Sequence, residues 1–161
     1  MKTLHLLRHG KSDWSDPPRP DHDRPLNERG KRARADVAAY VAGWPVDLVV
    51  CSTARRARAT ATPVVDALQC PVRVDEALYT ADGPDDLFAV IGEFADDLRT
   101  VMLVGHNPWI EELTAALCGT SPRYPTAALG TVELDIDHWG DVGQGSGTLV
   151  AHVTPSTLRT R

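Results

Sequence analysis

The chain has 161 residues, enough for one hydrophobic core of ordinary depth and too few for a second full domain. We therefore predict a single domain over residues 1–161. Its 22 acidic and 17 basic side chains give a net charge of −5. This balance argues against a nucleic acid or a membrane surface as the main partner.

Targeting and cysteine patterns point to a soluble protein of the cytoplasm. No apolar run approaches the ~20 residues of a membrane span, and residues 1–3 lead straight into an expected strand without a signal-peptide pattern. Cys51, Cys70 and Cys118 are an odd number without close spacing. Neither a disulfide framework nor a zinc site is therefore expected, and a reducing compartment is favoured.

The first expected strand ends in a polar cluster. Residues 4–7 are an apolar run, and Arg8, His9 and Gly10 follow directly. In open α/β sheets, ligands bind outside the carboxyl ends of the strands. A cationic pair at that edge, with a glycine that permits close backbone approach, indicates an anion site.

A loop and a helix are expected next. Residues 11–24 include Asp16-Pro17-Pro18-Arg19-Pro20-Asp21, whose prolines exclude regular pairing. We expect this loop to help wall the candidate site. Asn27 is then expected to cap a helix that Gly43 ends. The apolar face of that helix would contain Ala33, Val37, Tyr40 and Val41.

Two more apolar runs, residues 48–50 and 101–104, are expected strands that also end in polar residues. A helix should begin near Ser52, and Pro63 should kink or split it because proline removes a backbone donor. Pro84 fits the first turn of a third helix, with Leu87, Val90, Ile91 and Phe94 on one face. Asn107-Pro108 opens a fourth helix, which runs to Gly119.

The last third of the chain predicts two closing strands. Residues 131–136 alternate between apolar and polar, and a glycine-rich turn at 140–147 leads into a second such run at 148–153. The whole pattern predicts an α/β fold. We expect a three-layer sandwich in which helices flank a mainly parallel central sheet of about five or six strands.

Three strand ends together carry a recognisable pattern. Arg8-His9-Gly10 lies near the N-terminus, Ser52-x-x-x-Arg56-Ala57-x-x-Thr60 follows the second run, and Gly105-His106 comes late. In this order the chain resembles the histidine phosphatase superfamily, whose fold is phosphoglycerate mutase-like. The short chain and Arg24-Pro25-Leu26 look most like the SixA-type phosphohistidine phosphatases. The resemblance covers nearly the whole chain and implies a single histidine phosphatase domain.

The resemblance also implies roles for the core residues. His9 would be transiently phosphorylated, while Arg8, Arg56 and His106 bind the phosphoryl oxygens. A phosphoryl group carries about −1.5 to −2 charge, which planar guanidinium forks match well. A histidine with a pKa of ~6.5 is largely neutral at pH 7 and can attack phosphorus. We expect a backbone carbonyl to hold its other ring nitrogen, and His106 to be a donor that can be protonated against the phosphate.

Neighbouring residues are assigned by register. The family's arginine directly precedes Ala-x-x-Thr, which selects Arg56 and leaves Arg55 and Arg58 on the helix surface. Ser12 matches the position at which relatives carry a phosphate-contacting Ser or Thr. The remaining polar residues of the loop, Lys11, His22 and Arg24, are expected to be solvated charges rather than ligand contacts.

The general acid is expected to be Glu76, with Asp82 as its rival. Relatives carry a glutamate four positions before a glycine, and Thr80 replaces that glycine here. In this role the carboxyl group protonates the leaving atom and then deprotonates the water that hydrolyses phospho-His9.

Other functions stay open. A small-molecule phosphatase or a phosphoglycerate mutase-like isomerase would use the same core, although mutases carry extra segments and only 50 positions separate Arg56 from His106. A metal-dependent hydrolase could use His9, His106 and Asp21-His22-Asp23, but neighbouring arginines would repel a divalent cation. A phospho-ligand-binding module without turnover is the remaining alternative. We predict a metal-independent hydrolase without a cofactor, acting on a phosphorylated protein or small phosphorylated substrate, and leave the oligomeric state open.

Overall fold

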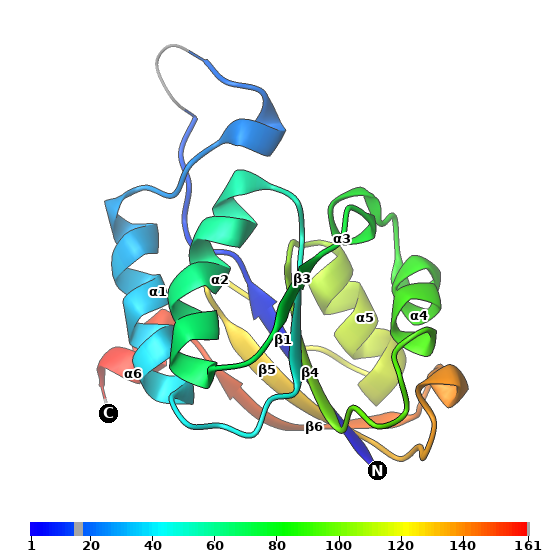
Figure 1. Cartoon of the computed structure of the whole chain (residues 1–161). Coiled ribbons are helices and arrows are strands. Elements are labelled where there is room, and N and C mark those ends of the chain that lie inside the picture. Colours follow the sequence, from blue (N-terminus) through cyan, green and yellow to red (C-terminus); the bar gives the residue numbers. More distant parts are fainter. Residues whose placement is uncertain (15–17, 161) are drawn as a thin grey trace.

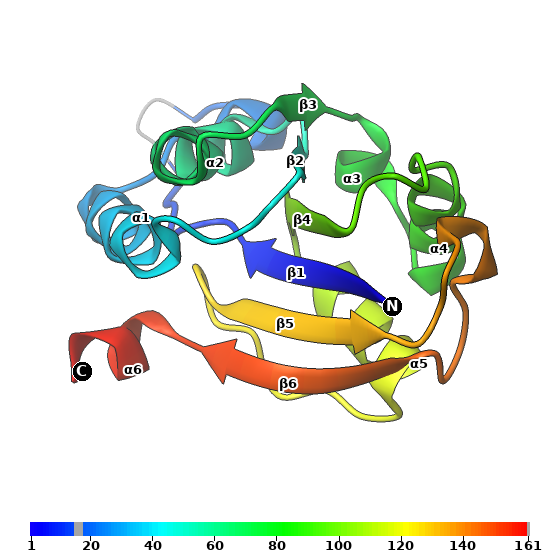
Figure 2. The same cartoon turned by 60° about the horizontal axis from the view of Figure 1, so that its bottom comes forward.

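A six-stranded sheet forms the centre of the computed structural model, which describes residues 1–14 and 18–160. The strands lie in the order β3-β2-β4-β1-β5-β6 (Figure 2). Their bounds are Lys2–Arg8 for β1, Leu48–Cys51 for β2, Val72–Val74 for β3, Thr100–Gly105 for β4, Leu129–Leu134 for β5 and Gly147–Val153 for β6. The pairings β1–β4, β2–β4 and β2–β3 are parallel, whereas β5 pairs antiparallel with β1 and β6. The expected mainly parallel sheet with a closing pair of strands is confirmed.

Helices cover both faces of this sheet and complete the three layers that the sequence predicts (Figure 1). On one face lie α1 (Glu28–Val41) and α2 (Arg55–Leu68), and α6 (Pro155–Arg159) contacts α1. On the other face lie α4 (Pro84–Gly92) and α5 (Trp109–Cys118). Short turns of helix are α3 (Ala77–Thr80), η1 (Asp21–Asp23) and η2 (Trp139–Asp141). Within the described part of the chain, no helix has the length and apolar character needed to cross a membrane.

Successive residues of the central strands alternate between the two cores. In β4, Val101 and Leu103 belong to the core under α4 and α5, while Met102 and Val104 belong to the core under α1 and α2. All four side chains are fully buried. A strand that is covered on both faces is apolar along its whole length. This packing fixes where each strand ends, and therefore where the polar residues that follow it lie.

The helix boundaries follow the predicted signals. The side chain of Asn27 caps α1 by accepting from the Gly30 N–H at 2.9 Å. Pro84 is in the first turn of α4, and Gly119 ends α5 with a φ of 90°. Helix α2 begins at Arg55, three residues later than the expected start near Ser52.

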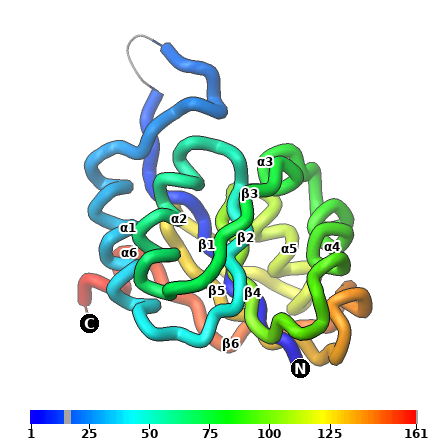
Figure 3. Tube along the Cα trace, in the orientation of Figure 1, coloured from blue at the N-terminus to red at the C-terminus, as the bar shows by residue number. Residues whose placement is uncertain are grey.

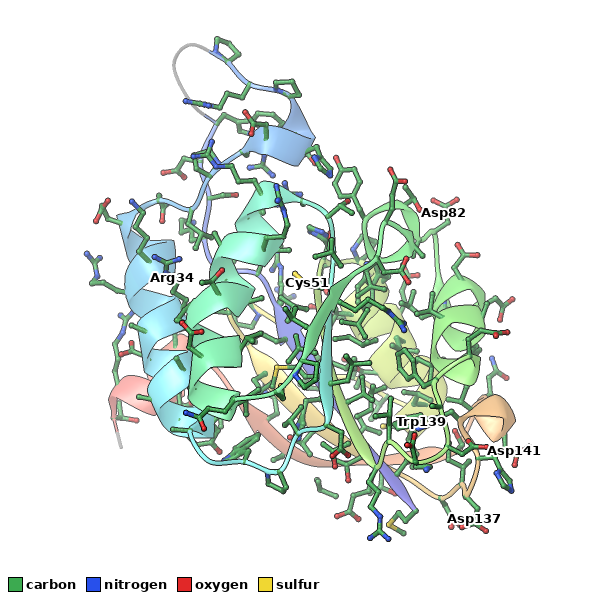
Figure 4. All side chains as sticks on the ribbon, viewed as in Figure 1. Arg34, Cys51, Asp82, Asp137, Trp139 and Asp141 are labelled. Atoms are coloured by element: carbon green, nitrogen blue, oxygen red, sulfur yellow. The ribbon has the colours of Figure 1, made fainter. Side chains whose placement is uncertain are left out.

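Of the two expected effects of Pro63, splitting does not occur, because Arg55–Leu68 is one continuous helix. A proline nitrogen carries no hydrogen, so the carbonyl of Ala59, four residues earlier, loses its helical partner. Arg34 of α1, which is labelled in Figure 4, supplies the missing donor. Its Nη1 lies 2.7 Å from the Ala59 oxygen. The proline therefore marks the point at which α1 and α2 are joined by a hydrogen bond.

The segment between β1 and α1 projects beyond the ends of the parallel strands (Figure 3). Ser12 forms a β-bridge with Leu26, and the Asn27 N–H donates to the Lys11 carbonyl at 3.0 Å. Residues 18–20 have no regular structure, as the prolines predict, and η1 follows. Positions 15–17 of the expected loop lie outside the described residues.

Candidate active site

Polar side chains from the ends of three strands meet at a cavity of about 320 Å³. Arg8 and His9 come from the end of β1, Arg56 from the first turn of α2, and His106 from the end of β4. The other lining residues are Lys11, Ser12, Arg24, Asn107 and Thr126. These lining residues, all from the described part of the chain, include cationic groups and no carboxylate. The cavity therefore suits an anion.

His9 is buried and presents one ring nitrogen for chemistry. Its Nδ1 lies 2.7 Å from the Gly10 carbonyl oxygen, so Nδ1 carries the hydrogen and Nε2 keeps its lone pair. The expected carbonyl partner is confirmed. Burial lowers the pKa of His9 to about 4, although the Gly10 bond raises it, and the charges of nearby arginines add to the lowering. The ring is therefore neutral at pH 7, which is the form that can attack phosphorus.

The two arginines predicted from the motif both line the cavity. Arg56 is buried, whereas Arg55 and Arg58 are exposed, as the register predicts. Arg56 Nη1 donates to the Asp21 carbonyl at 2.8 Å, and Arg8 Nη1 donates to another backbone carbonyl at 2.8 Å. The Nε atoms of Arg8 and Arg56 are buried without a partner among the described residues. Guanidinium groups that keep unused donors can bind the oxygens of an anion.

His106 is neutral in this site, and its protonation against a bound phosphate stays a prediction. Burial is the largest cause that lowers its pKa to about 3, and the neighbouring His9 and Arg56 lower it further. The rings of His9 and His106 are 5.0 Å apart between centroids. A second positive charge beside the arginines is unfavourable in so buried a place.

Ser52 is the hydrogen-bond partner of the His106 ring. Its Oγ lies 2.7 Å from His106 Nε2 and accepts from the Ala54 N–H at 3.2 Å. If the hydroxyl donates to Nε2, the neutral ring carries its own hydrogen on Nδ1. That Nδ1 is buried and has no partner among the described residues. A neutral N–H group can still donate to a phosphate oxygen.

The loop contributes more to the cavity than the sequence indicates. Ser12 lines it, and its Oγ accepts from Arg24 Nη1 at 3.0 Å. Arg24 and Lys11 also line the cavity, where Lys11 is exposed and Arg24 is half-buried, and the expectation that neither contacts the ligand stays a prediction. His22 is not a lining residue, in agreement with the expectation. Leu26, two residues after Arg24, is buried and anchors this part of the loop. An apolar residue there is the sequence feature that could have indicated that Arg24 lies close to the protein.

Asp21 ties the loop to the site and confirms that the loop helps to wall it. Asp21 Oδ2 accepts from Arg56 Nη2 at 3.2 Å and from the Tyr79 hydroxyl at 2.8 Å, and Oδ1 accepts from Arg24 Nε at 3.0 Å. Burial raises the pKa of Asp21, but the bond from Tyr79 and the charges and bonds of the two arginines bring it down to about 2. The carboxylate is therefore ionised at neutral pH.

Neither expected acid lies in the cavity. Glu76 is exposed, directly before α3, and Asp82 is exposed on the turn between α3 and α4 (Figure 4). Neither residue is among those that line the cavity. The short helix α3 instead turns Tyr79 toward the site, where its hydroxyl reaches Asp21 and its ring lies 5.7 Å from that of His106.

Two buried hydroxyl groups, which were not predicted from the sequence, hold the backbone and side chains of the site in place. Besides Ser52, Thr60 holds the backbone at the start of the site, since its Oγ1 accepts from the Gly10 N–H at 2.9 Å and donates to the Arg56 carbonyl at 2.8 Å. Ser52 and Thr60 are the first and last residues of the Ser-x-x-x-Arg-Ala-x-x-Thr pattern, so this pattern could have indicated their supporting roles. No pattern indicates the role of Asp21, because it lies in an irregular loop.

The metal ligands considered from the sequence do not form a metal centre. Among the described residues, no group of three or more His, Cys, Asp or Glu side chains could hold a metal ion. His9 and His106 bond Gly10 and Ser52 instead, and Asp21 bonds guanidinium groups.

Comparisons with known proteins agree with this geometry. A sequence model of the histidine phosphatase superfamily (branch 1) matches residues 4–82. An uncharacterized protein of Mycobacterium tuberculosis is 34% identical over 166 residues, which cover 92% of this chain and 99% of that relative. A solved structure assigned as the phosphohistidine phosphatase SixA of Nakamurella multipartitia matches with a TM-score of 0.81 and 29% identity, covering 96% of both chains. The protein histidine phosphatase SixA complexed with tungstate matches with a TM-score of 0.75 and 26% identity, covering 97% of this chain and 99% of that one.

The fold and the cationic cavity define a phosphatase, and thus a hydrolase, with a phosphoglycerate mutase-like fold. The chain belongs to the histidine phosphatase superfamily, and SixA phosphohistidine phosphatases are among its structural neighbours. A mycobacterial glucosyl-3-phosphoglycerate phosphatase, with a TM-score of 0.67 and 20% identity, shares the fold alone.

Proposed function

We propose that this phosphatase removes the phosphoryl group from phosphohistidine side chains of proteins, through a phospho-His9 intermediate and without a metal ion or cofactor. One observation carries the proposal. His9 Nδ1 is 2.7 Å from the Gly10 carbonyl, so its Nε2 lone pair is free, in a cavity that Arg8, Arg24 and Arg56 line. Fixed cations beside an aimed nucleophile are what phosphoryl transfer requires.

Five of the residues that line the cavity have a direct role in this reaction. Nε2 of His9 attacks phosphorus, the bond to the leaving nitrogen breaks, and water then hydrolyses phospho-His9. Arg8 and Arg56 bind the equatorial oxygens in both steps, and the N–H of His106 donates to one of them. Ser12 is the further hydroxyl contact, since it lines the cavity and is held by Arg24.

A phosphohistidine substrate fits the surroundings of this cavity. The imidazole of phosphohistidine leaves readily once it is protonated, so a P–N bond makes smaller demands on an enzymatic acid than a P–O bond does. Glu76 and Asp82 lie outside the lining of the cavity. The likeness to SixA structures at 26–29% identity supports the same substrate.

A second groove supports a protein as the carrier of the phosphohistidine. It has a volume of about 510 Å³ and shares Lys11 and Thr126 with the cavity. Arg29 and Arg159 also line it, and its lining residues, all from the described segments, include no carboxylate. Such a groove suits acidic side chains that surround a phosphohistidine on a partner protein.

The first test is kcat/KM across a panel measured in excess chelator. The panel contains a histidine-phosphorylated protein, phosphoramidate, a phosphoserine peptide and 3-phosphoglycerate. We expect the histidine-phosphorylated protein to be preferred, with a rate that the chelator leaves unchanged. A preference of more than tenfold for a phosphate ester, mutase turnover, or a rate that zinc or magnesium restores would contradict the proposal.

Arg29→Ala tests the groove within the same panel. Arg29 is exposed and lines the groove without lining the catalytic cavity. Loss of one rim charge is worth about 1 kcal/mol, so KM for the phosphorylated protein should rise roughly fivefold, several times more than KM for phosphoramidate. Arg32→Ala is the matched control, since Arg32 is exposed on the same helix outside the groove. Equal KM changes for both substrates would show that the groove does not bind the protein.

A further inference from the structure

We infer that Asp21 is the group that transfers protons in this reaction, in place of the glutamate expected from the sequence. The assignment rests on the proposed function, because it needs a phospho-His9 intermediate. Asp21 does not itself line the cavity, but its carboxylate accepts hydrogen bonds from two of the arginines that do, Arg56 and Arg24. Glu76 also lies outside the cavity lining, and it is exposed.

The contacts of Asp21 place it beside the position of a bound phosphoryl group. Arg56 Nη2 donates to Oδ2 at 3.2 Å, and Arg24 Nε donates to Oδ1 at 3.0 Å. The same two guanidinium groups line the cavity. The donors of a guanidinium lie in one plane, so two anions that share it are neighbours. Oxygen atoms of a substrate held by Arg56 and Arg24 are therefore adjacent to the Asp21 carboxylate.

Tyr79 completes the environment of this carboxylate. Its hydroxyl donates to Oδ2 at 2.8 Å and comes from α3, so the loop and α3 together fix the orientation of Asp21. The side chain of Asp21 is 42% exposed, which allows water to reach it. The group is thus oriented by three donors and still open to the solvent that must attack phospho-His9.

Substrate binding raises the pKa of Asp21, which is the change that an acid needs in order to carry a proton. In the free enzyme its hydrogen bonds and the arginine charges keep the pKa at about 2. A phosphoryl dianion on the same guanidinium groups neutralises their charge and adds a like charge beside the carboxylate. Both effects raise the pKa of a carboxyl group. Asp21 can therefore hold a proton while the phosphoryl group is bound.

The two steps balance with Asp21 as the only proton carrier. In the first step, His9 Nε2 forms a bond to phosphorus, the P–N bond of the substrate breaks, and its electron pair takes the proton of Asp21. In the second step, a water oxygen attacks phospho-His9 and gives one proton to the Asp21 carboxylate. The P–N bond to His9 then breaks, and its electron pair returns to Nε2. Inorganic phosphate and protonated Asp21 remain.

The test is rapid-quench measurement of phospho-His9 in Asp21→Asn with a histidine-phosphorylated protein. General acid and base catalysis contributes about 10²-fold or more. We expect phospho-His9 to be hydrolysed at least 100-fold more slowly than in the parent, and to accumulate, because a leaving imidazole that solvent protonates depends less on Asp21 than the attacking water does. The matched control is Asp23→Asn, because Asp23 lies in the same turn and pairs with the exposed Arg19 and Arg55. This control should behave as the parent does.

Chemical rescue separates proton transfer from a structural role. Asp21→Ala should lose hydrolysis of phospho-His9 and regain part of it when formate or acetate is added, at a rate that rises with the pKa of the added carboxylate, whereas a merely structural replacement would show no such dependence. Circular dichroism melting checks that each variant folds, and if Asp21→Asn does not, the rescue of Asp21→Ala decides.

Two results would overturn the assignment of Asp21. One is turnover of Asp21→Asn within threefold of the parent. The other is faster turnover of Asp21→Asn with tighter orthovanadate binding, which would make Asp21 an internal anion that competes with phosphate. A parent enzyme that forms no phospho-His9 would refute the proposed function itself, and this assignment with it.

Discussion

His9 and His106 lie in a cavity that three arginines line, and burial lowers the pKa of both, to about 4 and about 3. The neutral form of each ring is therefore the resting form. Each ring makes one hydrogen bond, His9 to the Gly10 carbonyl and His106 to the Ser52 hydroxyl. The proposed nucleophile and the proposed donor thus differ in their partners rather than in their residue type.

Neutral buried histidines predict a loss of stability at acid pH. In the unfolded chain each histidine titrates near pH ~6.5, whereas the folded pKa is about 4 for His5 and His9. Between these values the unfolded state binds protons that the folded state does not, so the free energy of unfolding decreases as the pH falls. The expected loss is about 1–3 kcal/mol for each histidine.

Urea unfolding between pH 7 and pH 5 measures this dependence. His9→Asn should show a shallower decrease in the free energy of unfolding than the parent. Equal slopes in His9→Asn and the parent would contradict a neutral, buried His9.

At the scale of elements, the pairing of α1 with the loop and with α2 holds the site together. A Cβ at Gly30 would lie 2.3 Å from the Lys11 carbonyl oxygen, so the first turn of α1 can approach the loop only with glycine there. Arg34 joins α1 to the Ala59 carbonyl of α2. Helix α2 in turn carries Arg56 into the cavity.

The Arg34 contact predicts a coupling with Pro63. Arg34→Ala leaves the Ala59 carbonyl without its donor, and an unsatisfied carbonyl costs about 1–3 kcal/mol. In Pro63→Ala the restored N–H bonds that carbonyl, so the further change Arg34→Ala should be less destabilising, by about 1 kcal/mol. A double-mutant cycle measured by urea unfolding tests this. The same effect of Arg34→Ala in both backgrounds would show that the two residues are not coupled.

At the scale of the whole molecule, the hydrophobic periodicity and the residues that begin or end helices and strands were sufficient to predict the architecture. The apolar runs at 4–7, 48–50 and 101–104 became the adjacent parallel strands β1, β2 and β4. Pro63 was the exception, because its compensating donor, Arg34, lies 25 positions from the carbonyl it satisfies. A local pattern does not contain a contact of that kind.

The candidate site also contains residues that the sequence could predict and one that it could not. Arg8, His9, Arg56 and His106 could be predicted to meet, because each follows a strand and the strands end at one edge of the sheet. The proton-transfer group could not be predicted. Asp21 comes from an irregular loop, whose conformation depends on contacts with other elements rather than on its own sequence pattern.

The direct measurement of the central claim is the identity of the phosphorylated residue in a single turnover. Rapid mixing of the enzyme with a histidine-phosphorylated protein, followed by alkaline quench and peptide mapping, should find acid-labile phosphate on His9. It should form and decay at rates consistent with turnover. His9→Ala should fold, form no phosphoenzyme and lose essentially all activity. Phosphate on another residue, or activity of His9→Ala within tenfold of the parent, would contradict the account.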